Sequence, residues 1–130
     1  HLGLGSSVVL QYADVLQKIS FQSFHLFFDN YFTSLSLLKE LKFRKIKATG
    51  TVRENRIPQS PLPQSQIFKK TKRGNFEYVV ADSEIVICKW NDNSVVTVAS
   101  NALKIFPLNK VRRFSQAEKN YININQPKLI

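Results

Sequence analysis

The chain has 130 residues, 43% of them hydrophobic, which is enough for one domain with its own core and excludes general disorder. Lysine and arginine total 19 against 9 acidic residues, and the net charge of +10 favours a polyanionic partner such as nucleic acid over the alternative of a basic domain without one. The single cysteine, Cys88, excludes an internal disulfide and fits a reducing compartment, and no apolar run approaches the roughly 20 residues of a membrane helix.

The first predicted element is an amphipathic helix that follows a serine cap at Ser6 or Ser7. Apolar side chains recur after this cap at the spacing of one helical face. The residues expected on that face are Val8, Val9, Tyr12, Val15, Leu16 and Ile19.

Two strands are predicted on either side of a second helix. Phe24 to Phe28 is a short apolar run of the kind found in buried strands, and Ile46 to Val52 has the composition of another strand. Between them, Ser34 is predicted to cap a leucine-rich helix that runs to about Arg44. The order of elements predicts a parallel pair joined by a crossover, and therefore an α/β fold.

The composition changes between Arg56 and Gln66, where three prolines indicate a linker or an extended boundary. Three strands separated by turn residues then predict an antiparallel meander over 75–80, 84–90 and 94–99. The residues after Ser100 carry basic side chains and a polar tail, and their pattern does not define elements.

Asp29 falls at the carboxyl end of the first predicted strand, the edge at which open α/β sheets gather functional side chains. It is a candidate ligand for Mg²⁺, which prefers oxygen donors, but one acid is insufficient for a metal site. The nearest other acids in sequence, Asp14 and Glu54, are expected to be solvated. The competing interpretation is a turn residue that bonds the backbone through its side chain, which is the commoner use of aspartate.

Other candidate residues have structural interpretations that compete with functional ones. His25 lies inside the apolar strand and is expected to be a partly buried histidine with its hydrogen bonds satisfied, while Cys88 and Trp90 are expected to pack in the sheet. A basic cluster interleaved with Phe68 could contact phosphates or be a solvated face, and the sequence does not favour either interpretation over the other. Its members are Arg53, Arg56, Lys69, Lys70, Lys72 and Arg73.

Three motifs stand in order along the chain: Phe-Asp-Asn-Tyr-Phe-Thr-Ser at 28–34, Ala-Thr-Gly-Thr-Val-Arg-Glu-Asn at 48–55 and Lys-Trp-Asn-Asp-Asn at 89–93. Together they resemble the central part of piggyBac-type transposases and of the domesticated proteins derived from such elements. The resemblance covers nearly the whole chain. One local departure is Lys45, where relatives often have a glycine that ends the helix.

The resemblance implies a ribonuclease-H-like catalytic core in which three acids bind two Mg²⁺ ions. Asp29 would be the second acid, with the first expected before His1 and the third beyond Ile130. Residues 1–55 would form part of this core and 56–100 a Pro-rich boundary with a β-meander insertion. Residues 101–130 would be a basic and polar segment that leads back toward the core.

We therefore expect an internal fragment of a piggyBac-like transposase-derived protein, from a family that cleaves and joins DNA strands at transposon ends. This chain alone is expected to be inactive and to bind no Mg²⁺ tightly, because it carries one of the three acids. The alternatives are a non-catalytic, basic DNA-binding module and a degenerate transposon remnant. The expected partner is DNA rather than a membrane, with a homodimer of the intact protein and a nuclear location.

Overall fold

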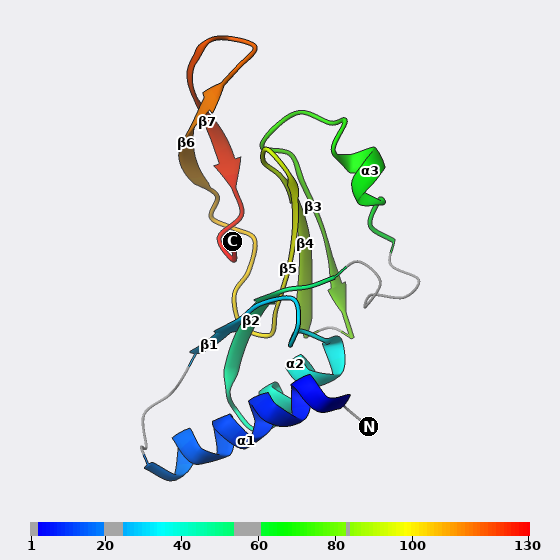
Figure 1. Ribbon diagram of the computed structural model, residues 1–130, viewed down its shortest axis with the longest axis vertical. Coiled ribbons are helices and arrows are strands. Elements are labelled where there is room, and N and C mark those ends of the chain that lie inside the picture. The colour runs from blue at the N-terminus through cyan, green and yellow to red at the C-terminus, as the bar shows by residue number, and fades with distance from the viewer. Residues whose placement is uncertain (1–2, 20–24, 54–60, 83) are drawn as a thin grey trace.

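The computed structural model describes residues 3–19, 25–53, 61–82 and 84–130, and these form the elements shown in Figure 1. Helices and strands alternate at the start of the chain, and strands dominate the rest. The first elements are α1 (Gly3–Ile19), β1 (His25–Phe28), α2 (Leu35–Phe43), β2 (Lys47–Thr51) and α3 (Ser65–Phe68). The later strands are β3 (Phe76–Ala81), β4 (Ile85–Asn91), β5 (Val95–Ser100), β6 (Asn109–Ser115) and β7 (Asn120–Gln126).

Strands β1 to β5 form one sheet in the order β1-β2-β5-β4-β3, and β6 pairs with β7 in a separate hairpin. The predicted parallel pair is confirmed, with β2 beside β1, and so is the predicted meander of β3, β4 and β5. Strand β2 pairs with β5 antiparallel, so the meander continues the same sheet and most neighbours in it are antiparallel. The boundary near residue 55 lies outside the described residues, and the division at 55 and 100 stays a prediction.

Helix α2 forms where the serine cap predicts it. The Ser34 hydroxyl accepts a hydrogen bond from the Leu37 amide at 3.2 Å, and the helix ends at Phe43. Its leucine face, Leu37, Leu38 and Leu41, is fully buried against the sheet. A core on this side of the sheet therefore includes α2, part of α1 and the inward residues of β2, β4 and β5.

The predicted apolar face of α1 is only partly correct. Val9 and Ala13 are buried, but Val8, Tyr12 and Val15 are 49%, 60% and 54% exposed. The physical reason is that the predicted residues span two adjacent stripes of the helix, and only the stripe that contains Val9 and Ala13 faces the protein. The other stripe points outward.

The predicted serine cap of α1 is wrong. The helix begins at Gly3, upstream of both serines, and Ser6 is buried within it at 3.4 Å from the Ser34 hydroxyl. The Ser7 hydroxyl donates to the Gly3 carbonyl at 2.9 Å, a bond made within the first helical turn. Serines inside a helix can make such local bonds, so their presence alone does not mark its start.

The opposite face of the sheet is covered by the segment that follows β5. Cys88 and Val98 pack there with Ile105 and Leu129. Burial raises the pKa of the Cys88 thiol to about 12, which agrees with the predicted packing role. Both faces of the central strands are thus covered by different parts of the chain.

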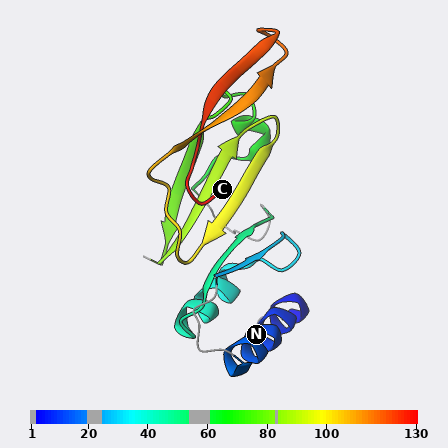
Figure 2. The ribbon, with the colours of Figure 1, turned by 90° about the vertical axis from the view of Figure 1, so that its left-hand side faces the viewer.

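The hairpin of β6 and β7 projects beyond the end of the sheet that is farthest from α1, as Figures 1 and 2 show. It lies in the part of the chain whose elements the sequence did not define. In the described part of the chain, no helix has both the length and the apolar character that crossing a membrane requires.

Candidate metal and nucleic-acid sites

Asp29 follows β1 directly and is exposed. Its Oδ1 accepts the Tyr31 amide at 3.0 Å, and its backbone carbonyl accepts the Phe32 amide at 3.2 Å and the Thr33 hydroxyl at 2.9 Å. The turn interpretation of Asp29 is therefore confirmed. The exposed carboxylate remains accessible, so a ligand role is compatible with the same turn.

The turn after β1 lies close against β2 at Gly50. A Cβ atom on Gly50 would stand 2.7 Å from the Phe28 carbonyl oxygen and would also collide with the Thr33 hydroxyl. The glycine in this motif is thus required by close approach of the backbone, since the turn that carries Asp29 leaves no room for a side chain.

His25 is the predicted satisfied histidine. Its Nε2 lies 2.8 Å from the Thr49 hydroxyl, which is 2.7 Å from the hydroxyl of Ser100. Burial and, secondarily, the positive charge of Lys47 lower the pKa of His25, which favours the neutral ring. The ring stacks on Phe27 with a centroid separation of 4.3 Å. These contacts tie β1 across β2 to β5.

Asp29 has no cluster of further metal-ligand side chains around it in the described part of the chain. Within ranges 3–19, 25–53, 61–82 and 84–130, no three histidine, cysteine or acidic side chains come together as metal ligands. Asp14 forms an ion pair with Arg44 at 2.9 Å, and Glu54 lies outside the described residues. A lone carboxylate does not complete the two-ion site that the resemblance implies, so the ligand role of Asp29 stays a prediction.

The predicted basic cluster is divided between two places. Arg53 is exposed just after β2, and Arg56 lies outside the described residues. Residues 69–73, which we call the basic loop, follow α3 and connect it toward β3. Lys69, Lys70 and Lys72 are exposed on this loop and available to an anionic partner.

Arg73 belongs to the basic loop but faces the protein. Its Nε donates to Asp92 at 2.8 Å, and its Nη1 donates to the Phe114 carbonyl at 2.9 Å. Arg113 donates from the hairpin to the other oxygen of Asp92 at 2.9 Å. The Asp92 carboxylate therefore joins the basic loop, the β4–β5 turn and β6. The phosphate contact predicted for Arg73 stays a prediction.

Burial by itself would raise the pKa of Asp92. Hydrogen bonds from Arg113 and Arg73 outweigh burial, and the net pKa of the carboxyl is lowered. The carboxylate is thus ionised at neutral pH. It balances part of the positive charge where three segments meet.

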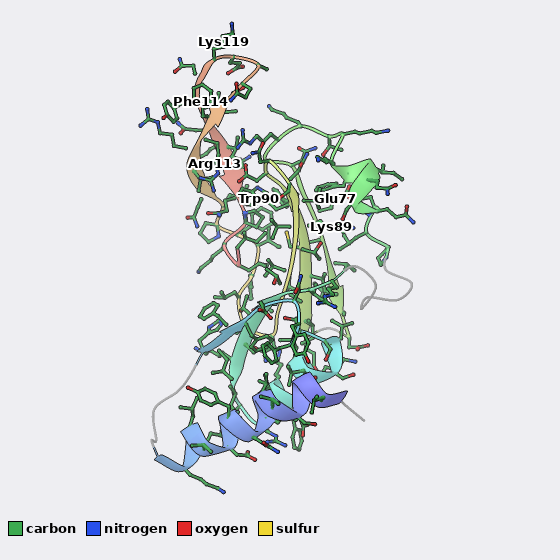
Figure 3. All side chains as sticks on the ribbon, viewed as in Figure 1. Glu77, Lys89, Trp90, Arg113, Phe114 and Lys119 are labelled. Atoms are coloured by element: carbon green, nitrogen blue, oxygen red, sulfur yellow. The ribbon has the colours of Figure 1, made fainter. Side chains whose placement is uncertain are left out.

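The side chains of the Lys-Trp-Asn-Asp motif bond segments of the chain outside the central sheet. Lys89, which is 3% exposed, donates to the Pro63 carbonyl ahead of α3. Trp90, also 3% exposed, donates its indole N–H to the Asn125 carbonyl in β7 at 2.6 Å, which confirms the predicted packing role. Asn91 donates to the Thr71 carbonyl in the basic loop at 2.8 Å. Figure 3 shows Lys89 and Trp90 on β4 below Arg113. This motif anchors α3, the basic loop and the hairpin to the sheet.

The outer face of the hairpin is a candidate surface that the sequence interpretation missed. Its register pairs Lys110 with Asn125, Arg112 with Asn123 and Phe114 with Tyr121, all on one face. A sequence signal existed, because Val111 and Arg113 alternate with these residues on β6, and Ile122 and Ile124 alternate with asparagines on β7. The asparagines give β7 a polar composition, and this composition is not typical of a strand.

Comparison with known proteins identifies the class of protein. The sequence profile of the family described as Transposase IS4 matches residues 1–130, and the chain belongs to that family. Human PiggyBac transposable element-derived protein 2 is 45% identical over 130 residues, covering 99% of this chain and 22% of that protein. Human PiggyBac transposable element-derived protein 3 is 43% identical over 128 residues, covering 98% of this chain and 22% of that protein. The predicted resemblance to piggyBac-type transposases is confirmed.

A solved structure supports the fold as well. A chain of the piggyBac transposase, in a cryo-EM structure of its synaptic complex with hairpin DNA, matches 90% of this chain with a TM-score of 0.51. The identity is 21%, so the likeness concerns the fold, and the match covers 23% of that chain. The present chain thus spans less than a quarter of the length of the relatives it matches.

Proposed function

We propose that this chain is part of a piggyBac-like transposase-derived protein and contributes Asp29 to a site for Mg²⁺-dependent DNA strand cleavage and joining. The observation that carries the proposal is the exposed carboxylate at the end of a parallel strand, held by a turn packed on Gly50, in a chain of a transposase family. Under this proposal, α1, β1, α2 and β2 belong to a partial ribonuclease-H-like core.

The proposal includes inactivity of this chain by itself, since no three potential metal ligands come together among the described residues and a two-ion site needs several carboxylates. It also places the intact protein in the nucleus, as a homodimer acting on DNA. Mg²⁺ would supply charge stabilisation for phosphoryl transfer in that intact protein.

The catalytic part of the proposal is tested with end-labelled duplex DNA in the presence of Mg²⁺ or Mn²⁺. The chain is expected to release no more product than its Asp29→Ala variant. Turnover by the unmodified chain that the substitution abolishes would contradict inactivity.

The ligand part has a separate readout, paramagnetic broadening of amide NMR signals by Mn²⁺. We expect weak broadening at Asn30 and Tyr31 that disappears in Asp29→Asn but persists in Asp14→Asn. Broadening unaffected by Asp29→Asn would contradict the assignment of Asp29 as a ligand.

A second candidate function is a non-catalytic DNA-binding module. It is favoured by the three exposed lysines of the basic loop and by the net charge of +10. Binding of a short duplex, followed by fluorescence anisotropy across a salt series, tests this candidate. Each phosphate contact should contribute about 0.9 to the slope of log affinity against log salt.

The matched variants are Lys70→Gln/Lys72→Gln in the basic loop and Lys18→Gln/Lys42→Gln on the helices, which remove the same charge. The first pair should lower the slope by about 2 and the second pair by much less. Equal effects of the two pairs, or affinity that does not depend on salt, would contradict a DNA contact through the basic loop.

A further inference from the structure

We infer that the outer face of the β6–β7 hairpin is a second DNA-contacting surface, which inserts as a two-stranded ribbon into a groove of duplex DNA. This inference rests on the proposed DNA partner but concerns residues outside the predicted basic cluster. The surface, which we call the hairpin face, consists of Lys110, Arg112, Phe114, Tyr121 and Asn123.

The two faces of the hairpin have different environments. On the inner face, Ile124 is buried and Arg113 is held by Asp92, so this side is attached to the sheet. On the hairpin face, Lys110, Arg112 and Asn123 are exposed, as are the rings of Phe114 and Tyr121 at 43% and 54%. The alternation of a β-strand therefore separates a docking side from an outward side with cationic, amide and aromatic groups.

Arg112 and Arg113 are neighbours in sequence with opposite roles. Arg113 is committed to a carboxylate, whereas no described residue accepts a hydrogen bond from the Arg112 guanidinium. Arg112 instead lies over the Tyr121 ring, with Cζ 4.0 Å from the ring centroid. This stacking orders the guanidinium while leaving the donors at its edge available to an acceptor on a partner.

A contact between the Phe114 and Tyr121 rings helps to hold the hairpin face in this conformation. The Phe114 and Tyr121 rings meet edge to face with centroids 5.4 Å apart, and the two residues are register partners on β6 and β7. Such a contact stabilises a ribbon that has no third strand beside it. The hairpin face is thus ordered before a partner binds, which lowers the entropic cost of binding.

The charge on the hairpin fits a polyanion. Residues 109–126 contain four basic residues, Lys110, Arg112, Arg113 and Lys119, against a single acidic one, Glu118. The hairpin lies beside the basic loop, since Arg73 of that loop bonds the Phe114 carbonyl and shares Asp92 with Arg113. Lys119 stands at the projecting tip (Figure 3). Two basic surfaces therefore meet at one end of the molecule.

The shape favours duplex DNA over a flat anionic surface. A two-stranded ribbon fits the major groove, which is roughly 12 Å wide, and arginine, lysine and asparagine are the side chains that read its base edges. The hairpin projects from the body in both views, so its outer face can enter a groove without the sheet in the way (Figures 1 and 2).

The test compares two charge-matched double variants in duplex binding by fluorescence anisotropy. Lys110→Gln/Arg112→Gln changes the hairpin face, and Lys18→Gln/Lys42→Gln changes helices at the opposite end of the molecule (Figure 1). The hairpin variant should bind about tenfold more weakly and lower the salt slope by about 2, with the helix variant close to the unmodified chain.

Trp90 provides the control for folding, because it is the single tryptophan and bonds the hairpin backbone at Asn125. Its emission should be unchanged in the hairpin variant, which shows that the hairpin still docks. A single-stranded oligonucleotide of the same sequence should bind more weakly than the duplex.

The outcomes separate this inference from the proposed function. Duplex binding that falls with the basic-loop variant but not with the hairpin variant would overturn the inference alone. Tighter binding of the single strand, weakened by Lys110→Gln/Arg112→Gln, would overturn the assignment of a groove. Absence of any DNA binding by the unmodified chain would overturn both the inference and the DNA-binding candidate.

Discussion

Arg113 donates its Nε–H to Oδ2 of Asp92 at 2.9 Å, and this contact fixes a projecting hairpin to the turn between two sheet strands. The same carboxylate binds Arg73 through its other oxygen. Asp92 is thus a fixed anion in a strongly basic chain, and it holds together the two surfaces that we assign to DNA. The position of those surfaces relative to each other depends on this residue.

Substituting Asp92 with asparagine should lower the free energy of unfolding by about 1–3 kcal/mol, because two charge-assisted hydrogen bonds lose their common acceptor. Denaturant unfolding followed by Trp90 emission measures the change. Asp82→Asn is the control, since its ion pair with Lys39 is 60% exposed on the aspartate side and should contribute little. Equal stability of Asp92→Asn and the unmodified chain would contradict the structural role of the carboxylate.

The lowered pKa of Asp92 predicts a loss of stability in acid. The unfolded carboxyl titrates at about 3.9 and the folded one below that value, so the unfolded state takes up the proton first. The contribution of Asp92 is therefore complete above the unfolded pKa and disappears as the pH falls through the folded one. Unfolding measured between neutral pH and about pH 2 should show a steeper decline for the unmodified chain than for Asp92→Asn.

Gly50 and Gly5 give opposite predictions for the same substitution. Gly50→Ala should lower the free energy of unfolding by about 1–3 kcal/mol or more, because its Cβ would collide with Thr33 and the Phe28 backbone. Gly5→Ala lies inside α1, where the nearest atom to a new Cβ is at 3.4 Å, and should stabilise by about 0.5–1 kcal/mol. Thermal unfolding of the two variants checks the contrast. An unchanged free energy of unfolding for Gly50→Ala would contradict the close contact of Gly50 with Thr33 and Phe28.

The local parts of this fold could be predicted from the sequence, while the contacts between distant segments could not. The Ser34 cap and the apolar run before Asp29 are signals within a few residues, and they gave a correct helix and a correct parallel strand. The bond from Trp90 to Asn125 joins residues 35 positions apart, and no local pattern specifies it. The anchoring role of the Lys-Trp-Asn-Asp motif became visible only in three dimensions.

The candidate sites show the same division. Asp29 was placed correctly at a strand end, but its turn and the close approach of Gly50 depend on how two strands pack. Arg73 and Lys72 are neighbours with the same charge, yet one faces Asp92 and the other faces solvent. Charge in a sequence locates a basic region, whereas the choice between an ion pair and an open surface is made by tertiary contacts.

Lys45 should be replaceable by glycine with a gain in stability. Its φ of 63° lies in the left-handed region, and it follows the end of α2. The Ile46 amide bonds the Leu41 carbonyl at 2.8 Å and the Lys45 amide bonds that of Lys42 at 2.9 Å, which is the pattern of a Schellman motif. Glycine adopts this conformation without the steric penalty of a side chain, so a lysine at this helix end carries a conformational cost.

Lys45→Gly is therefore expected to raise the free energy of unfolding by about 0.5–1 kcal/mol, after the greater flexibility of glycine in the unfolded chain is taken into account. Lys42→Gly, three residues earlier and inside the helix, is the matched control and should lower it by about 1 kcal/mol. Both variants remove one positive charge, so a charge effect would move them in the same direction. If denaturant unfolding gives changes of opposite sign in the free energy of unfolding, the difference comes from backbone conformation. Destabilisation by both variants would contradict the left-handed conformation of Lys45.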